Sequence, residues 1–171
     1  TKGVIPFIPE DVAVAILSEA LRWVEEHGDT IVAAETIRRE ARAQGLRRCK
    51  RQASDHVRAA LRLASLAGPS GERLDGAYAV RHAAVHLVEA CYILIAGFVG
   101  MRSSEILSMK TGAIEQHPIG GTGVNQAYVV SRLFKTVDDL DGRRERWVAP
   151  APVVRAVELL EQLSAPLREA S

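Results

Sequence analysis

The run ACYILIAGFVG, residues 90–100, restricts the possible folds of this chain more than any other feature. The apolar stretch around it, from Leu87 to Met101, contains Glu89 and is shorter than the roughly 20 residues that a membrane span needs. It therefore predicts a buried core helix, with Gly100 as the residue that ends it. The chain has 171 residues, 47% of them hydrophobic, and this is enough to surround the helix with one soluble domain.

An arginine, Arg102, follows the predicted end of this helix after one intervening methionine. An arginine buried at such a position loses solvation energy unless an anion compensates its charge. That anion can belong to the chain, with Glu105 and Glu115 as candidates, or it can be a ligand. The first alternative gives Arg102 a structural role, and the second gives it a functional one.

The rest of the chain predicts a mainly α fold of the α+β class, a helical domain with a small antiparallel β-hairpin. Apolar residues at helical spacing predict a first helix that ends before Gly28, with an apolar face made by Val12, Ile16, Ala20 and Trp23. Further helices are expected over 30–45, 53–67, 78–99, 103–109, with Ser103 as its N-cap, and 153–163. β-Branched and aromatic residues predict two strands, 127–134 and 144–150, that pair as the hairpin.

Positive charge is concentrated in one segment, although the whole chain has a net charge of only +1. Between Arg38 and Arg62, nine basic residues stand against two acidic ones. We expect this basic helical insertion, 29–77, to separate an opening helix, 1–28, from a core, 78–171. Arginines with few acids nearby favour contact with phosphates, and the alternative is a solvated charged helix. The residues expected on a DNA-binding face are Arg38, Arg39, Arg42, Arg47, Arg48, Lys50 and Arg51, together with Arg144 from the second strand.

The cysteines and histidines do not predict a metal site. Cys49 and Cys91 lie 42 positions apart without disulfide or CxxC spacing, which favours a reducing compartment, and Cys91 is expected to be a small core residue. His82, His86 and Glu89 share one helix face and could be three zinc ligands, but they lack the HExxH pattern. A polar stripe on an apolar helix is the prediction, and no metal or cofactor is assigned.

The order of these motifs resembles the N-terminal half of the catalytic domain of the tyrosine recombinases, also called phage-type integrases. Around its first catalytic arginine this family has a stretch like TGLR-x-SE-L-x-x-L. The chain has VGMRSSEILSM, which agrees at Gly100, Arg102, Ser104, Glu105, Ile106 and Met109. The resemblance covers about residues 78–163, whereas residues 30–75 match no feature of the family.

The resemblance implies a site-specific recombinase that cuts and rejoins DNA through a phosphotyrosine intermediate, without a metal or nucleotide. Arg102 would bind the scissile phosphate, because a guanidinium can donate two parallel hydrogen bonds to phosphate oxygens. Backbone N–H groups at the start of the following helix would favour the same anion. Glu105, one helical turn on, would support the arginine. Lys135 corresponds to the lysine of the family's β-hairpin, which would protonate the leaving 5′-oxygen.

The other catalytic residues of the family have no counterpart in this sequence. No HxxR motif and no tyrosine follow Arg146, and the three tyrosines, Tyr78, Tyr92 and Tyr128, all precede the hairpin turn. We therefore expect the polypeptide to be inactive by itself, as a fragment of an integrase or as a degenerate remnant. The implied partner is double-stranded DNA and not a membrane. The parent protein would act as a homotetramer on DNA, in the bacterial cytoplasm and associated with the nucleoid.

Two other functions stay open from the residues alone. Residues 30–67 could form a helix, a glycine turn and a recognition helix, which is typical of a non-catalytic helix-turn-helix-like DNA-binding regulator. The basic patch could instead bind an acidic protein, and the chain would then be a helical interaction module.

Overall fold

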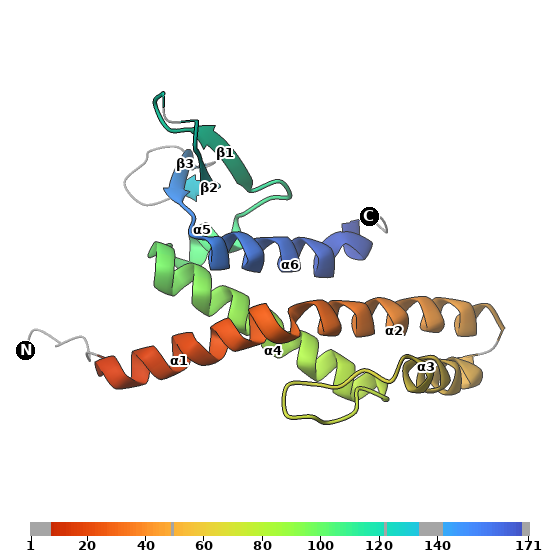
Figure 1. The fold of residues 1–171 in the computed structure, drawn as a ribbon. Coiled ribbons are helices and arrows are strands. Elements are labelled where there is room, and N and C mark those ends of the chain that lie inside the picture. Colours follow the sequence, from red (N-terminus) through yellow and green to blue (C-terminus); the bar gives the residue numbers. More distant parts are fainter. Residues whose placement is uncertain (1–7, 49, 122, 134–141, 169–171) are drawn as a thin grey trace, which may run out of the picture.

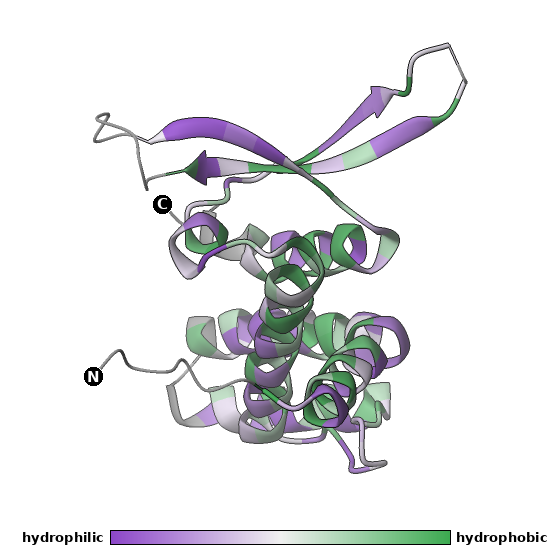
Figure 2. Cartoon of the chain, turned by 90° about the vertical axis from the view of Figure 1, so that its left-hand side faces the viewer, coloured by the Kyte–Doolittle hydropathy of each residue, from purple (hydrophilic) through white to green (hydrophobic). Residues whose placement is uncertain are grey.

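The computed structural model describes residues 8–48, 50–121, 123–133 and 142–168, apart from the side chains of residues 47, 48, 50, 51 and 166–168. It is mainly helical and has one three-stranded antiparallel sheet, which confirms the predicted α+β class. The sheet lies at one end of the molecule, and α1, α2 and α3 lie at the other end (Figure 1, Figure 2).

One long, nearly straight helical segment runs across the molecule (Figure 1). It consists of α1 (Glu10–Arg22), a π-helical segment η1 (Trp23–His27) and α2 (Gly28–Arg48). The predicted end at Gly28 is wrong, because Gly28 has helical φ and ψ angles of −53° and −52°. The glycine permits close packing instead, since a Cβ atom there would lie 2.6 Å from Cδ1 of Leu159. The expected boundary at residue 28 therefore falls inside a continuous helix.

The first half of α1 extends beyond the core. Val12 and Ile16, predicted as part of its buried face, are 43% and 44% exposed, whereas Ala20 is buried as predicted. Leu17 makes the contact with the core, because a Cβ atom on Gly97 of the crossing helix would lie 2.7 Å from its Cδ2. The face that α1 presents to the core is thus offset from the predicted one.

The second predicted glycine turn also lies inside a helix. Gly45 is a buried residue of α2, and a Cβ atom there would lie 2.5 Å from Cα of Ala53 in α3 (Lys50–Ala64). Val57 and Leu61 are buried, which confirms the predicted core face of α3. A helix-turn-helix unit joins its two helices by a short turn that often contains glycine. Gly45 brings two helices into contact here and forms no such turn.

Helix α4 (Ala77–Val99) confirms the predicted core helix. Leu87, Leu94 and Ile95 are completely buried, and so is Cys91, as predicted. Gly100 ends the helix with a φ of 72°, a conformation that favours glycine, and its N–H donates to the carbonyl of Ala96. By length and composition alone, α4 could also cross a membrane, and 33% of its most apolar 18-residue window is buried in this fold.

The sheet contains the predicted hairpin and one further strand. Its strands are β1 (Ile114–Pro118), β2 (Asn125–Leu133) and β3 (Arg143–Val148), in the order β1-β2-β3 and all antiparallel. The β2–β3 pair confirms the predicted hairpin, whereas β1 was not predicted. Val129 pairs with Ile114 on one side and with Trp147 on the other, and it is completely buried. These residues mark the face of the sheet that packs on the helices.

The last helix, α6 (Ala151–Arg168), connects the two ends of the molecule. It begins just before the predicted start and runs beyond the predicted end, and its residues Val153, Ala156 and Leu159 are completely buried. A single hydrophobic core includes buried residues from α2, α4, α6 and β2. The chain is therefore held together around α4 and α6.

Candidate functional site

Arg102 lies between α4 and α5 (Ser103–Leu107), where the backbone turns sharply after Gly100. It is the residue before the first turn of α5, so the predicted N-cap at Ser103 is wrong by one position. Its side chain is 56% exposed, which corrects the expectation of an arginine buried at the end of the core helix. The guanidinium therefore needs no compensating ligand for stability, but it is accessible to one.

Glu105 holds Arg102 in place, which is the pairing that the structural alternative for Arg102 required. One carboxylate oxygen accepts the backbone N–H of Arg102 at 2.7 Å, and the other accepts Nη1 of its guanidinium at 3.2 Å. The Glu105 side chain is only 4% exposed. Nη1 has this one protein contact, and within the described part of the chain no contact is seen for Nε or Nη2 of Arg102. Two donor nitrogens of the guanidinium, Nε and Nη2, thus remain available for an oxyanion.

At the start of α5, the chain's own carboxylate takes one of the backbone N–H groups that could favour an anion. The helix has five residues, and the carboxylate of Glu105 already occupies its N-terminus by accepting the N–H of Arg102. The protein's own carboxylate is therefore the anion at this position.

A buried hydroxyl fixes α5 against the sheet. Ser131 of β2 is 5% exposed and donates its hydroxyl to the carbonyl oxygen of Glu105 at 2.5 Å. Ser108 donates to the same carbonyl at 3.0 Å, and the two hydroxyls lie 3.0 Å apart. On the other side, the hydroxyls of Tyr92 and Ser103 lie 2.6 Å apart. Hydrogen bonds from α4 and from β2 thus set the position of α5, and with it the position of Arg102.

The face of the sheet that points away from the helices is rich in cations. The pairing register places Glu115 beside Tyr128, Val130 beside Arg146, and Arg132 beside Arg144. The guanidinium of Arg146 lies 5.5 Å from the centre of the Tyr128 ring. Among the described residues of this face, three arginines stand against a single glutamate, a balance that favours anionic partners.

Glu115 contacts one of these arginines and a neighbouring histidine. It accepts a hydrogen bond from Arg144, and its carboxylate lies 3.1 Å from Nε2 of His117. The hydrogen bond from His117 and the charge of Arg144 hold the pKa of Glu115 below its usual value, although burial alone would raise it. Arg144, a predicted DNA contact, is thus exposed but held by a neighbouring carboxylate.

The basic helices present fewer free cations than the sequence suggested. Glu35 is 5% exposed and accepts two hydrogen bonds from Arg38, at 2.6 and 2.7 Å, and one from Arg39, at 2.6 Å. Arg39 also donates to the carbonyl oxygen of Leu163 at 2.9 Å. Of these two predicted DNA contacts, Arg38 is thus paired within α2 and Arg39 joins α2 to α6, whereas Arg42 is exposed.

Several predicted site residues lie outside the described part of the structure. They are Lys135 and the side chains of Arg47, Arg48, Lys50 and Arg51. The structure brings Arg102 and Glu105 together, and it does not test the other pairings.

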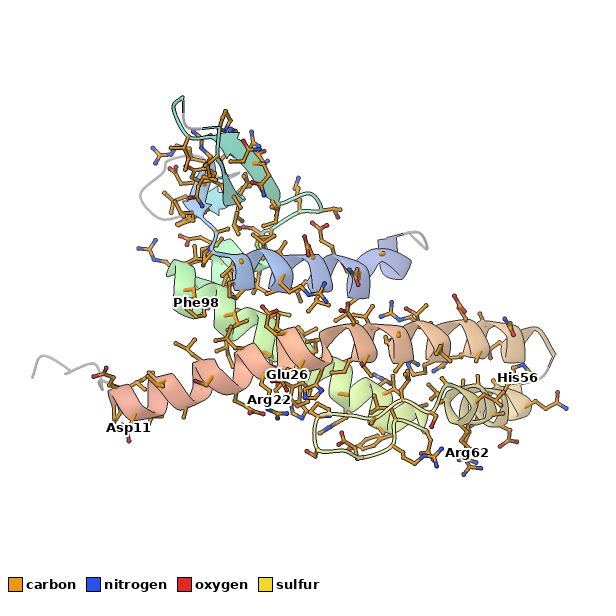
Figure 3. The ribbon with its side chains drawn as sticks, in the orientation of Figure 1. Asp11, Arg22, Glu26, His56, Arg62 and Phe98 are labelled. Carbon is orange, nitrogen blue, oxygen red and sulfur yellow. The ribbon has the colours of Figure 1, made fainter. Side chains whose placement is uncertain are left out.

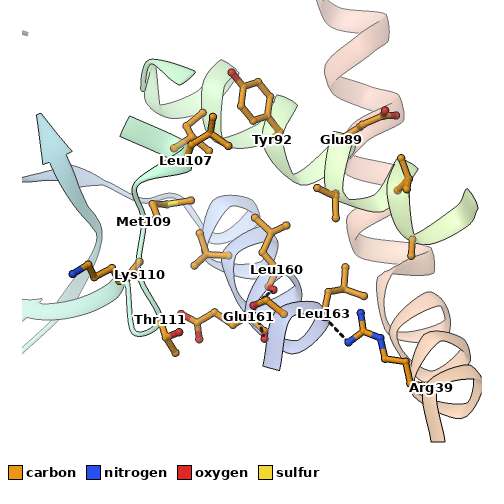
Figure 4. Close-up of a pocket in the computed structure, with 17 residues that line it drawn as sticks. Arg39, Glu89, Tyr92, Leu107, Met109, Lys110, Thr111, Leu160, Glu161 and Leu163 are labelled. Carbon is orange, nitrogen blue, oxygen red and sulfur yellow. Dashed lines mark hydrogen bonds between the residues drawn. The ribbon is translucent and has the colours of Figure 1, made fainter. Parts of the chain in front are cut away.

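An apolar groove of about 850 Å³ adjoins α5 (Figure 4). It lies between α4, the segment after α5, and α6, and Tyr92, Leu107 and Leu160 line it. Leu107 is 80% exposed. Such walls suit an apolar surface and not a phosphate. The groove was not predictable from the sequence, because its lining comes from segments that are far apart in the chain.

The comparisons with known proteins gave no relative. No protein-family model, no curated protein and no solved structure matches this chain.

Proposed function

We propose that this chain is part of a site-specific DNA recombinase of the tyrosine recombinase type, in which Arg102 binds the scissile phosphate. One observation carries the proposal: an exposed guanidinium is fixed by a buried carboxylate and keeps two donors for a ligand. A guanidinium that is already oriented loses less conformational entropy when it binds a phosphate. Glu105 is then a positioning residue, because it acts through Arg102.

The cationic face of the sheet supports the same partner. In the proposal, Arg144 and Arg146 contact the phosphate backbone of double-stranded DNA beside the cleavage site, and Lys135 is the acid that protonates the leaving 5′-oxygen. Strand β2, which leads toward Lys135 in the sequence, is joined to α5 by the hydrogen bond between Ser131 and Glu105. The strand and the arginine would thus move as one unit.

The nucleophile has to come from outside these 171 residues. In the proposed reaction, a tyrosine hydroxyl from outside this chain gives its proton to a general base that is also outside it, and the phenolic oxygen attacks the phosphorus. The bond from the phosphorus to the 5′-oxygen breaks, this oxygen takes a proton from Lys135, and Arg102 stabilises the charge that develops on the non-bridging oxygens. No tyrosine and no HxxR motif follow Arg146. The coding sequence that follows Ser171 tests this part. HxxR followed by a tyrosine is the expected result, and a stop codon there would exclude catalysis.

DNA binding by the chain itself tests the role of Arg102. Affinity for a fluorescent duplex is measured by anisotropy over a range of salt concentrations, for the parent chain, Arg102→Gln and Arg102→Lys. Loss of one phosphate contact should lower the slope of log K against log salt by about 0.9 in Arg102→Gln. Arg102→Lys should keep most of the slope but bind more weakly, because an ammonium cannot donate in the same bidentate way.

Two matched controls make the result specific. Arg81→Gln removes an exposed arginine from α4, outside the site, and should bind like the parent. Arg42→Gln removes an exposed arginine from α2 and tests the DNA-binding regulator. If binding falls in Arg42→Gln and is unchanged in Arg102→Gln, the recombinase proposal is wrong and the regulator replaces it.

A further inference from the structure

Two histidines of α4 place their side-chain nitrogens side by side on the helix surface. Nε2 of His82 and Nε2 of His86 are 3.3 Å apart. Nδ1 of His86 lies 2.8 Å from a carboxylate oxygen of Glu89. His82 is exposed and the side chain of His86 is 40% exposed, so both can be reached from solvent.

The carboxylate decides which nitrogen of His86 is available. Glu89 accepts a hydrogen bond from Nδ1–H, which leaves the lone pair of His86 on Nε2. His82 must then donate its Nε2–H to that lone pair in the metal-free protein. When the proton of His82 moves to Nδ1 through water, both Nε2 atoms carry a lone pair and no net charge changes.

The distance between the two Nε2 atoms fits a metal ion. Zinc is bound by histidine nitrogens at about 2.0–2.1 Å and prefers tetrahedral geometry, and two such nitrogens are about 3.3 Å apart. This is the separation that the structure has between the two Nε2 atoms. A carboxylate that accepts the other N–H of a ligating histidine is also the usual support of such a site.

Neighbouring aromatic rings restrict the two imidazoles. The Trp23 ring stands edge-on to His86, with ring centres 5.6 Å apart, and the Tyr78 ring stacks on His82 at 5.9 Å. The indole N–H of Trp23 donates to Glu19, so this ring is itself held in position. Each imidazole therefore has an aromatic ring beside it that limits its movement.

We propose that His82 and His86 bind a divalent transition-metal ion of the zinc and copper class through their Nε2 atoms, with Glu89 as the positioning residue. Two protein ligands leave the other coordination positions to water or to an external ligand. No group of three or more metal-binding side chains occurs among the described residues, so the affinity should be modest, and higher for Cu²⁺ than for Zn²⁺. The proposal does not depend on the recombinase function.

Calorimetric titration with Cu²⁺ and with Zn²⁺ at pH 7.5 tests the site. Cys49→Ser serves as the parent, because a thiol would bind the same metals. We expect one ion per chain, and binding at least about tenfold weaker in His82→Ala and in His86→Ala, since each removes one of two ligands. Glu89→Gln should weaken binding by about 10–100-fold, as loss of an outer-shell partner does.

His56→Ala is the matched control. His56 lies on α3 (Figure 3), whereas the proposed ligands lie on α4, so loss of His56 should leave the affinity for the metal unchanged. Circular dichroism confirms that each variant is folded, and exposed His82 keeps the test valid if His86→Ala unfolds. Equal affinity in His82→Ala and the parent, or no binding of either metal at millimolar concentration, would overturn the proposal.

Discussion

Replacing Gly45 by alanine should destabilise the protein, although the same change stabilises most helices. In a helix interior, alanine is favoured over glycine by about 1 kcal/mol. At this position, however, the new Cβ would lie 2.5 Å from Cα of Ala53 and 3.1 Å from its Cβ. The first of these atoms belongs to the backbone of α3, so the clash can be relieved only if the two helices separate.

The expected magnitude follows from these two opposed effects. Overpacking of a well-packed interior costs about 1–3 kcal/mol, and a backbone clash belongs at the upper end of that range. Subtracting the gain in helix propensity leaves a net loss of about 2 kcal/mol. For a chain of this size the loss corresponds to a fall in Tm of about 4–8 °C.

Gly97→Ala is the matched control, because it places a Cβ equally close to a different kind of atom. There the neighbour is Cδ2 of Leu17 at 2.7 Å, the end of a partly buried side chain that can rotate. Gly97→Ala should therefore be unchanged or more stable by up to about 1 kcal/mol. Urea unfolding followed by circular dichroism measures both variants. A Gly45→Ala protein as stable as the parent, with the same m-value, would refute the close contact between α2 and α3.

Three further predictions concern buried polar groups. Burial raises the pKa of Glu35, but the hydrogen bonds from Arg38 and Arg39 outweigh it and hold the pKa below its usual value. This stability is present above the unfolded pKa of about 4.3 and is lost as pH falls through the lower folded pKa. Glu35→Gln should therefore lower the free energy of unfolding by about 3 kcal/mol at pH 7 and reduce its dependence on pH in the acid range, both measured by urea unfolding. An unchanged pH dependence would contradict the pairing of Glu35 with the two arginines. Burial raises the pKa of the Cys91 thiol to about 12. In a Cys49→Ser background, Cys91 should therefore react with a thiol reagent at pH 8 only after the protein is denatured. Rapid reaction of the folded protein would contradict the burial of this thiol. Ser131→Ala should lower the free energy of unfolding by about 1 kcal/mol, because Ser108 still donates to the carbonyl of Glu105. Urea unfolding measures this loss, and a much larger value would mean that the Ser131 hydroxyl has a further partner.

The fold could be predicted where one local signal was sufficient. The apolar run and Gly100 predicted α4 and its end, because only glycine adopts the left-handed conformation readily. Gly28 and Gly45 misled the prediction for the same reason. Glycine also permits close contact between helices, and the contacts that decide between the two uses, with Leu159 and Ala53, come from other elements.

The candidate site was predictable in part. The three-residue spacing of Arg102 and Glu105 predicted their contact, since residues three apart are neighbours on a helix. The exposure of Arg102 was not predictable, because it depends on how α5 is placed against α4 and β2. The pairing of Arg38 and Arg39 with Glu35 was missed, although these residues also have helical spacing. The count of charges began at Arg38 and therefore did not include Glu35, the buried acid that pairs with both arginines.

The π-helical segment η1 has a consequence for how the chain tolerates length changes. The buried residues Ala20, Val24 and Gly28 are separated by two successive steps of four, and each such step would rotate the buried face of an α-helix by about 40°. The wider π turn absorbs this rotation, as one inserted residue does in a π-bulge. Deleting one residue there, at exposed Glu25 for example, would restore a regular helix and turn α1 by about 100° about its axis. A single codon thus decides whether Leu17 faces the core or solvent, which makes this segment the most length-sensitive part of the long helix.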